Sequence, residues 1–199
     1  MRSSLFFESN FPFSPSRAPF FYGWVILIFT TLGTVASIPG QTMGVGVFTD
    51  YLINNTSLNR MQISVSYMIG TILSSLLILL SGSYVDRFGT RLMISIAGIG
   101  LGISLILFSQ SLVLISYLES KLPEYSSSLI SIIVMTLIFL LLRQFGQGLL
   151  AMVSRITLSK WFDRRRGLVS GISGIFVAFS FSGAPLFMNE IIGEYGYSK

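Results

Sequence analysis

The sequence contains no cysteine and no histidine. Without cysteine there are no disulfides, no thiolate zinc sites and no thiol nucleophiles, and without histidine the commonest metal ligand and proton-transfer group is missing. These absences argue against an enzyme. We therefore expect no catalytic residues, no metal site and no cofactor.

Charged residues are also scarce. They make up 11% of the 199 residues, whereas a globular chain carries about 25%. Apolar residues account for 52% of the chain, and the mean hydropathy is +0.75. Because there is too little charge to cover a water-facing surface, much of the surface must face lipid. The sequence predicts an all-α integral membrane protein whose partner is the lipid bilayer.

Five apolar runs bounded by charged residues follow one another along the chain. A helix needs about 20 apolar residues to cross a hydrocarbon core roughly 30 Å thick, and each run is long enough. The expected transmembrane helices cover about residues 21–52, 61–85, 92–118, 128–158 and 167–192. Residues 1–20 are rich in Phe, Ser and Pro and are predicted to form a flexible cytoplasmic tail.

The distribution of Lys and Arg predicts the orientation, since cytoplasmic loops carry an excess of these residues. With a cytoplasmic amino terminus, the cytoplasmic side carries the larger group of basic residues: Arg2, Arg17, Arg87, Arg91, Lys160, Arg164, Arg165 and Arg166. The opposite side carries Arg60, Lys121 and Lys199. We interpret the net charge of +5 as a topology signal and not as a nucleic-acid surface. The expected location is the plasma membrane or an inner membrane, crossed several times.

Arg143 lies near the middle of the fourth apolar run. A guanidinium at the bilayer centre costs about 2.5–3.5 kcal/mol on insertion scales, so Arg143 must face protein, water or an anion. Gln147 is four residues further on and shares its helix face. These two residues predict an anion-binding or proton-coupling site; the alternative is an arginine held by carbonyls and hydroxyls of neighbouring helices. Arg155, close to the cytoplasmic end of the run, is expected to extend to the headgroups.

The first run is interrupted by Pro39 and several glycines. Proline removes a backbone hydrogen bond, and such a break is tolerated at membrane depth only beside protein or a water-filled cavity. Gln41 and Thr42 are therefore candidate solute-binding residues, although a kink packed through Gly40-xxx-Gly44 is the alternative. We also expect Gly98-xxx-Gly102 and Gly167-xxx-Gly171 to allow close helix packing.

A short loop is predicted between the second and third runs, from Gly82 to Arg91. It places Asp86 beside Arg87 and Arg91, so that the carboxylate can bind helix amides or a neighbouring guanidinium. We interpret this loop as a latch between helices. A solvated turn is the alternative.

The residues from Gly82 to Arg91 resemble the signature loop of the major facilitator superfamily, Gly-x-x-x-Asp-Arg-x-Gly-x-Arg, with Gly82, Asp86, Arg87, Gly89 and Arg91 at its defined positions. The Arg143-x-x-Gly146-x-Gly148 pattern is similar to that family's fourth-helix motif. The segment 160–172 resembles the corresponding loop in the oxalate/formate and monocarboxylate porter branch.

The resemblance implies that residues 21–199 are a partial amino-terminal transporter domain, with five helices of a six-helix half, and that the sixth helix and the second half are absent. It implies transport of a small solute, an organic or inorganic anion, by alternating access. The solute would be held between two halves, the other being a missing second half or a second copy of the chain. H⁺ or another ion would couple to transport. Arg143, Gln147, Gln41 and Thr42 would bind the solute, and the signature residues would control gating. The alternative is a truncated, non-transporting membrane protein or an interaction partner.

Overall fold

The computed structural model describes residues 21–56 and 58–195, and every regular element within these ranges is helical. The predicted tail, residues 1–20, lies outside them. In chain order the elements are α1 (Gly23–Ala36), the 3₁₀ turn η3 (Ile38–Gly40), α2 (Thr42–Asn55), α3 (Arg60–Ser109), α4 (Ser111–Lys121), α5 (Ser127–Leu142), the π-helical segment η4 (Arg143–Leu150), α6 (Ala151–Trp161) and α7 (Arg166–Tyr195). The first predicted run is therefore two helices separated by a break, and the third is divided at Gln110.

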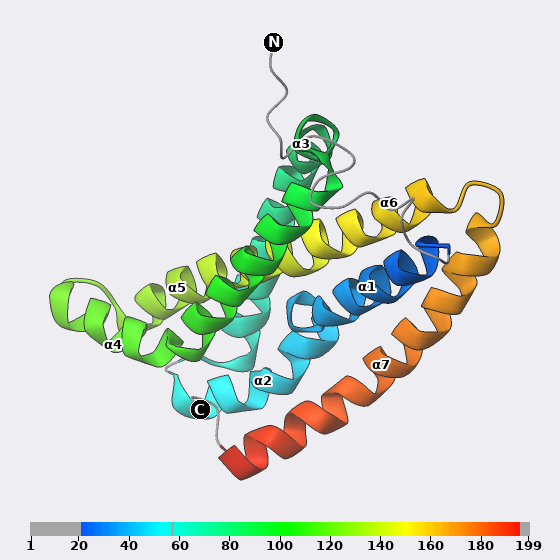
Figure 1. Cartoon of the computed structure of the whole chain (residues 1–199). Coiled ribbons are helices and arrows are strands. Elements are labelled where there is room, and N and C mark those ends of the chain that lie inside the picture. The colour runs from blue at the N-terminus through cyan, green and yellow to red at the C-terminus, as the bar shows by residue number, and fades with distance from the viewer. Residues whose placement is uncertain (1–20, 57, 196–199) are drawn as a thin grey trace.

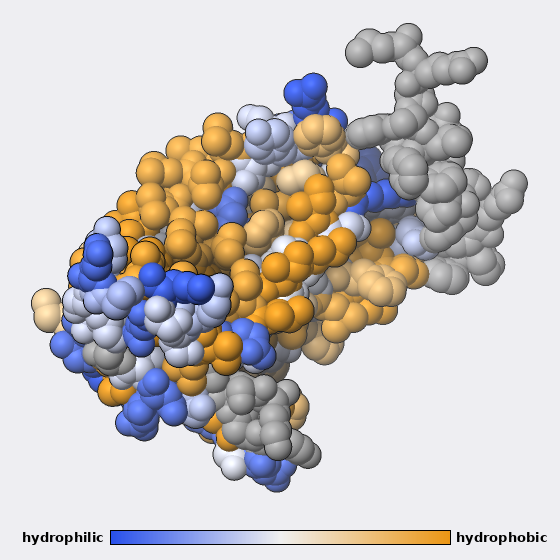
Figure 2. Space-filling view, turned by 90° about the vertical axis from the view of Figure 1, so that its left-hand side faces the viewer, coloured by the Kyte–Doolittle hydropathy of each residue, from blue (hydrophilic) through white to orange (hydrophobic). Residues whose placement is uncertain are grey.

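Large apolar side chains cover much of the surface. Phe29, Leu79, Phe179 and Leu186 are each at least 66% exposed. Figure 2 shows hydrophobic residues across the middle of one face and hydrophilic residues gathered toward its two ends. Such a surface is stable in lipid and not in water.

Within the described ranges, three helices are long and apolar enough to cross a membrane: Arg60–Ser109, Ser127–Trp161 and Arg166–Glu194. With 14 residues, α1 is about 21 Å long, short of the roughly 30 Å hydrocarbon core. The expected five crossings are not confirmed.

The 50 residues of α3 do not form one straight rod, which would be about 75 Å long. Gly89 has φ 79° and ψ 160°, the one non-helical conformation inside α3. Figure 1 shows α3 rising to a bend and then returning toward α4. The predicted loop from Gly82 to Arg91 is thus wrong in its extent: the chain is helical on both sides of Gly89, and one residue makes the bend.

Replacing Gly89 with alanine is expected to destabilise the protein by about 1–3 kcal/mol, because this φ/ψ region is essentially restricted to glycine. Thermal unfolding in detergent micelles measures the effect as a lower midpoint. Gly98→Ala is the matched control, because Gly98 is helical and an added Cβ there meets nothing within 4 Å. Equal midpoints for the two variants would contradict the expectation that alanine is strained in the backbone conformation of position 89.

The start of α3 follows from a capping box. The Asn59 side chain accepts a hydrogen bond from the Gln62 backbone N–H at 2.9 Å, and the Gln62 side chain accepts one from the Asn59 N–H at 2.9 Å. Two otherwise unpaired donors are satisfied in this way. The long helix α3 then packs against α5 through fully buried residues that include Ile63, Met135 and Phe139.

The close helix contacts involve different glycines from those expected. A Cβ on Gly70 of α3 would lie 2.9 Å from the Leu140 backbone nitrogen of α5, so this glycine sets the α3–α5 approach. At the glycines of the Gly98-xxx-Gly102 and Gly167-xxx-Gly171 pairs, a Cβ would meet no described residue within 4 Å. The prediction that these two pairs pack closely is wrong.

Candidate functional site

The break between α1 and α2 lies against the fourth apolar run. Pro39 is at the start of η3, and Gln41 has an extended backbone conformation with φ −87° and ψ 159°. A Cβ on Gly40 would lie 2.4 Å from the Leu142 carbonyl oxygen and 2.9 Å from the Cα of Gly146. The predicted break is therefore present, and it is in backbone contact with the segment that carries Arg143.

This contacting segment is the π-helical η4, Arg143–Leu150, in the middle of a helix that runs from Ser127 to Trp161. π-Helical turns are rare and occur frequently at functional sites. Gly146 and Gly148 are buried within η4, and their lack of side chains allows η3 and α3 to approach. The wider turn changes the angular positions of the residues that follow it along the helix.

Arg143, at the start of η4, is half-buried and contacts residues of α2 and α3. Its Nη1 donates to the Thr42 hydroxyl at 3.4 Å, and its Cζ lies 5.3 Å from the centroid of the Tyr67 ring. The Thr42 and Tyr67 hydroxyls are hydrogen-bonded to each other at 2.9 Å. No carboxylate in residues 21–56 or 58–195 forms an ion pair with Arg143. Its positive charge is held by a hydroxyl and an aromatic face and is not neutralised.

A pocket of about 220 Å³ opens beside Arg143. Gln147 and Gly148 of η4 form one side of it, and α3 contributes Thr71, Ser74, Ser75 and Ile78. The Thr71 hydroxyl has no hydrogen-bond partner within the described part of the chain. The pocket thus combines a cation, an amide and hydroxyl groups, which are the donors that bind small anions.

A second pocket, of about 430 Å³, adjoins the first and shares Ile78, Gln147 and Gly148 with it. Gln41 and Arg155 also line it. A third pocket, of about 310 Å³, shares Arg155 and extends to residues of α1 and α7, namely Thr34, Ser170, Ser173, Gly174 and Val177. None of the described residues that line these three pockets is acidic.

The four predicted solute-binding residues are thus brought together: three of them line the two adjoining pockets, and the fourth only contacts Arg143. Arg143 and Gln147 line the first pocket, and Gln41 lines the second. Thr42 contacts Arg143 directly and lines neither. The Gln41 side chain also donates to the Ser37 hydroxyl at 3.1 Å, which holds it beside η3.

Several residues of this region were not identified from the sequence. Thr71 and Ser75 belong to a different apolar run, and no local pattern links them to Arg143. Arg155 was expected at the headgroups, yet it lines two of the pockets. The three pockets are linked by shared lining residues and together form one polar groove, the solute groove. The signal for it in the sequence was the presence of two guanidinium groups on one apolar run.

Gln144, next to Arg143, lines none of the three pockets and lies in the contact with α3. It is 8% exposed; its amide nitrogen donates to Ser81 at 3.0 Å, and its carbonyl oxygen accepts from Ser74 at 3.1 Å. Both ends of the side chain are satisfied. Gln144 therefore joins α3 to η4.

The predicted gating residues lie apart from these pockets, at the bend of α3 (Figure 1). Asp86, Arg87 and Arg91 are exposed. The Arg87 guanidinium lies 5.5 Å from the Phe88 ring. Asp86 has no hydrogen bond or ion pair with any residue that the structure describes. The latch assigned to Asp86 stays a prediction.

The model of the Major Facilitator Superfamily matches residues 30–198, which is most of the chain. No curated protein and no solved structure matches. The match supports the superfamily and does not support assignment to the oxalate/formate and monocarboxylate branch. Members of this family are transporters of small solutes in lipid bilayers, not enzymes. The protein belongs to the major facilitator superfamily.

Proposed function

We propose that the transported solute is a small anion and that it binds in the pocket beside Arg143. The observation that carries the proposal is the positive charge of Arg143: it lies on a membrane helix, lines a pocket and has no carboxylate partner among the described residues. A charge in this environment is costly unless it is compensated. An anion in the pocket would compensate it.

The other pocket groups suit the same ligand. Gln147 presents an amide donor, and Thr71 presents a hydroxyl without a partner in the described ranges. Thr42 and Tyr67 contact the guanidinium and do not line the pocket. In the proposed complex, Arg143 supplies the charge and Gln147 and Thr71 orient the anion.

The proposed mechanism is alternating access. The chain would cross the membrane five times, with α1, η3 and α2 as one crossing and the two arms of α3, residues 60–88 and 90–109, as two more. The amino terminus would be cytoplasmic, which places Asp86, Arg87 and Arg91 on the cytoplasmic side, where they would control the rocking of one half against another. That other half, or a second copy of this chain, would close the open side of the groove. A coupling ion such as H⁺ would drive accumulation.

Thermal unfolding of the detergent-solubilised protein with a panel of solutes tests the anion assignment. Acetate, lactate, oxalate and phosphate are compared with uncharged acetamide, lactamide and glycerol at constant ionic strength. A ligand that binds only the folded state at 100 times its Kd stabilises it by about 2.7 kcal/mol, so at least one anion is expected to raise the midpoint. Stabilisation by the uncharged analogues, with none by the anions, would contradict the proposal.

A further inference from the structure

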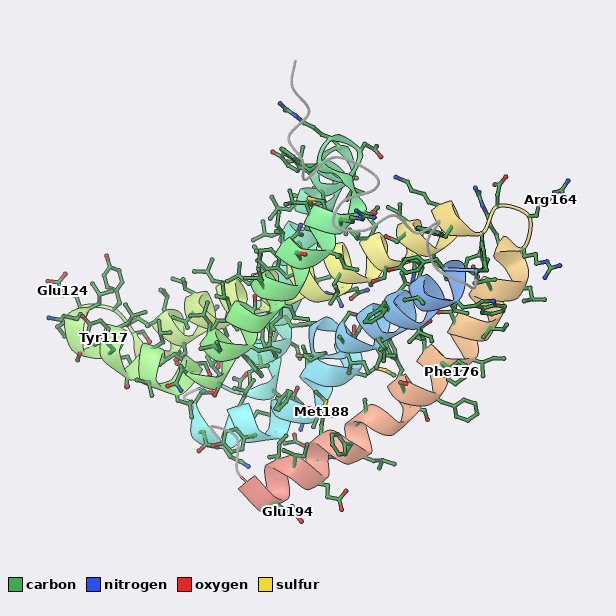
Figure 3. The ribbon with its side chains drawn as sticks, in the orientation of Figure 1. Tyr117, Glu124, Arg164, Phe176, Met188 and Glu194 are labelled. Carbon is green, nitrogen blue, oxygen red and sulfur yellow. The ribbon has the colours of Figure 1, made fainter. Side chains whose placement is uncertain are left out.

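A separate cavity of about 470 Å³ lies where the connection between α6 and α7 meets the start of α1. It shares no residue with the three pockets of the solute groove. Aromatic and basic side chains dominate its lining: Phe21, Trp24, Trp161, Phe162, Arg164 and Arg165. Figure 3 labels Arg164 at this end of the molecule, with Glu124 and Glu194 at distant positions.

The aromatic residues form a packed wall. The rings of Phe21 and Phe162 are in edge contact with centroids 5.5 Å apart, and Trp24 contacts Phe162 at 6.2 Å. Phe162 is buried, whereas Trp24 is 49% exposed. Tryptophans with one apolar side and one wet side are typical of the membrane–water interface. The cavity is therefore placed at headgroup depth.

The charge of the cavity is positive. Arg164 and Arg165 are exposed and form no ion pair in the part of the chain that the structure describes. Asp163 also lines the cavity, but its carboxylate is paired with Arg166 at 2.9 Å. The helix α7 begins at Arg166, so its first backbone N–H groups add partial positive charge at the same place.

An apolar crevice of about 280 Å³ continues from this cavity between the same two helices. On α1 it begins at Leu27, about one turn after Trp24, and on α7 at Ile172, one turn after Leu168. The other lining residues are mainly apolar: Ile28, Thr31, Leu32, Val35, Phe176 and Ser180. A hydrogen bond of 2.8 Å between Thr31 and Ser173 ties the two helices together at the crevice.

We infer that the cavity and the crevice together bind one anionic phospholipid. The phosphate lies against Arg164, Arg165 and the amino-terminal end of α7, the glycerol backbone contacts Trp24, and an acyl chain fills the crevice between α1 and α7. Arginines and helix N-termini are both phosphate-binding groups, and basic pockets between membrane helices bind anionic headgroups. The crevice is lined mainly by apolar side chains, which is the environment that an acyl chain requires.

The protein's own tryptophans report on this site, because the chain has two tryptophans and both line the cavity. The experiment measures tryptophan fluorescence of the full chain in phosphatidylcholine bilayers that contain phosphatidylglycerol brominated near the ester end of its acyl chains. Bromine quenches tryptophan only at close range. Stronger quenching than by brominated phosphatidylcholine at the same mole fraction is expected.

Arg164→Gln and Arg165→Gln are each expected to lower the relative binding constant for phosphatidylglycerol about fivefold, because a basic residue near the membrane surface attracts anionic lipid by about 1 kcal/mol. Lys160→Gln is the matched control: it removes the same charge from the adjacent last turn of α6, but Lys160 does not line the cavity. The control is expected to change the constant much less than either arginine variant.

Two results would overturn the inference. The first is equal quenching by the two brominated lipids. The second is an equal loss of preference for phosphatidylglycerol in Lys160→Gln and the arginine variants, which would show a general surface-charge effect.

Glycerol 3-phosphate added to the protein in pure phosphatidylcholine distinguishes the source of the phosphate. A change of tryptophan fluorescence in that experiment, without preference for brominated phosphatidylglycerol, would assign the cavity to a soluble phosphate compound.

Discussion

Arg143→Ala is expected to abolish solute uptake while leaving the protein folded and inserted in the membrane. The guanidinium supplies the positive charge of the pocket, and a hydrogen bond to a charged group contributes about 1.5–3 kcal/mol. The loss therefore corresponds to roughly 10- to 100-fold weaker anion binding. Arg143→Lys keeps the charge but loses the bidentate geometry, so it is expected to restore part of the affinity.

Uptake into proteoliposomes and the anion-induced shift of the unfolding midpoint measure the two effects separately. Lys121→Ala is the matched control, because Lys121 is an exposed basic residue in the last turn of α4 and lines none of the three pockets. Uptake by Arg143→Ala at the level of the unmodified protein would refute the role assigned to Arg143. If an anion shifts the unfolding midpoint of Arg143→Ala as much as that of the unmodified protein, the anion binds at a site other than the pocket beside Arg143.

Gly40→Ala is expected to destabilise the protein by about 1–3 kcal/mol and to weaken anion binding at the same time. The new Cβ would lie 2.4 Å from the Leu142 carbonyl oxygen and 2.9 Å from the Cα of Gly146. Both are backbone atoms, so η3 can make room only by moving away from η4. This movement separates Gln41 from Gln147, which line the same pocket.

The thermal midpoint with and without a stabilising anion measures both parts of this expectation. Gly46→Ala on α2 is the control, since a Cβ there meets nothing within 4 Å. Alanine is the better helix former, by about 1 kcal/mol, so this control is expected to keep or raise the midpoint. Gly40→Ala with the stability of the Gly46 control would show that the η3–η4 contact is not tight.

Much of the fold follows from local sequence. The helical membrane class follows from the scarcity of charge and the apolar runs. The break after α1 follows from Pro39, which cannot donate a backbone hydrogen bond. The bend at Gly89 was predicted at the right place but as a longer loop, because composition marks a junction and does not show that one positive φ is enough to make it.

The glycines show where such reasoning fails. Gly40 contacts a neighbouring backbone, and Gly98 contacts none, although both belong to a Gly-xxx-Gly pair. The spacing places two glycines on one helix face, but it does not say which face meets another helix. That depends on the rotation and crossing of helices that are distant in sequence.

The sequence by itself determined the helical membrane class, the superfamily resemblance, the helix break at Pro39 and the presence of a charged Arg143 within an apolar run. Only the tertiary structure decided which side chains join Arg143. In the folded chain Gln144 lies in the contact with α3, and Thr71 of α3 lines the pocket beside Arg143. Arg155 lines the adjoining pocket. The physical reason is that side-chain direction depends on helix phase and helix packing. The π-helical η4 changes that phase within the run, and no local residue pattern encodes the change.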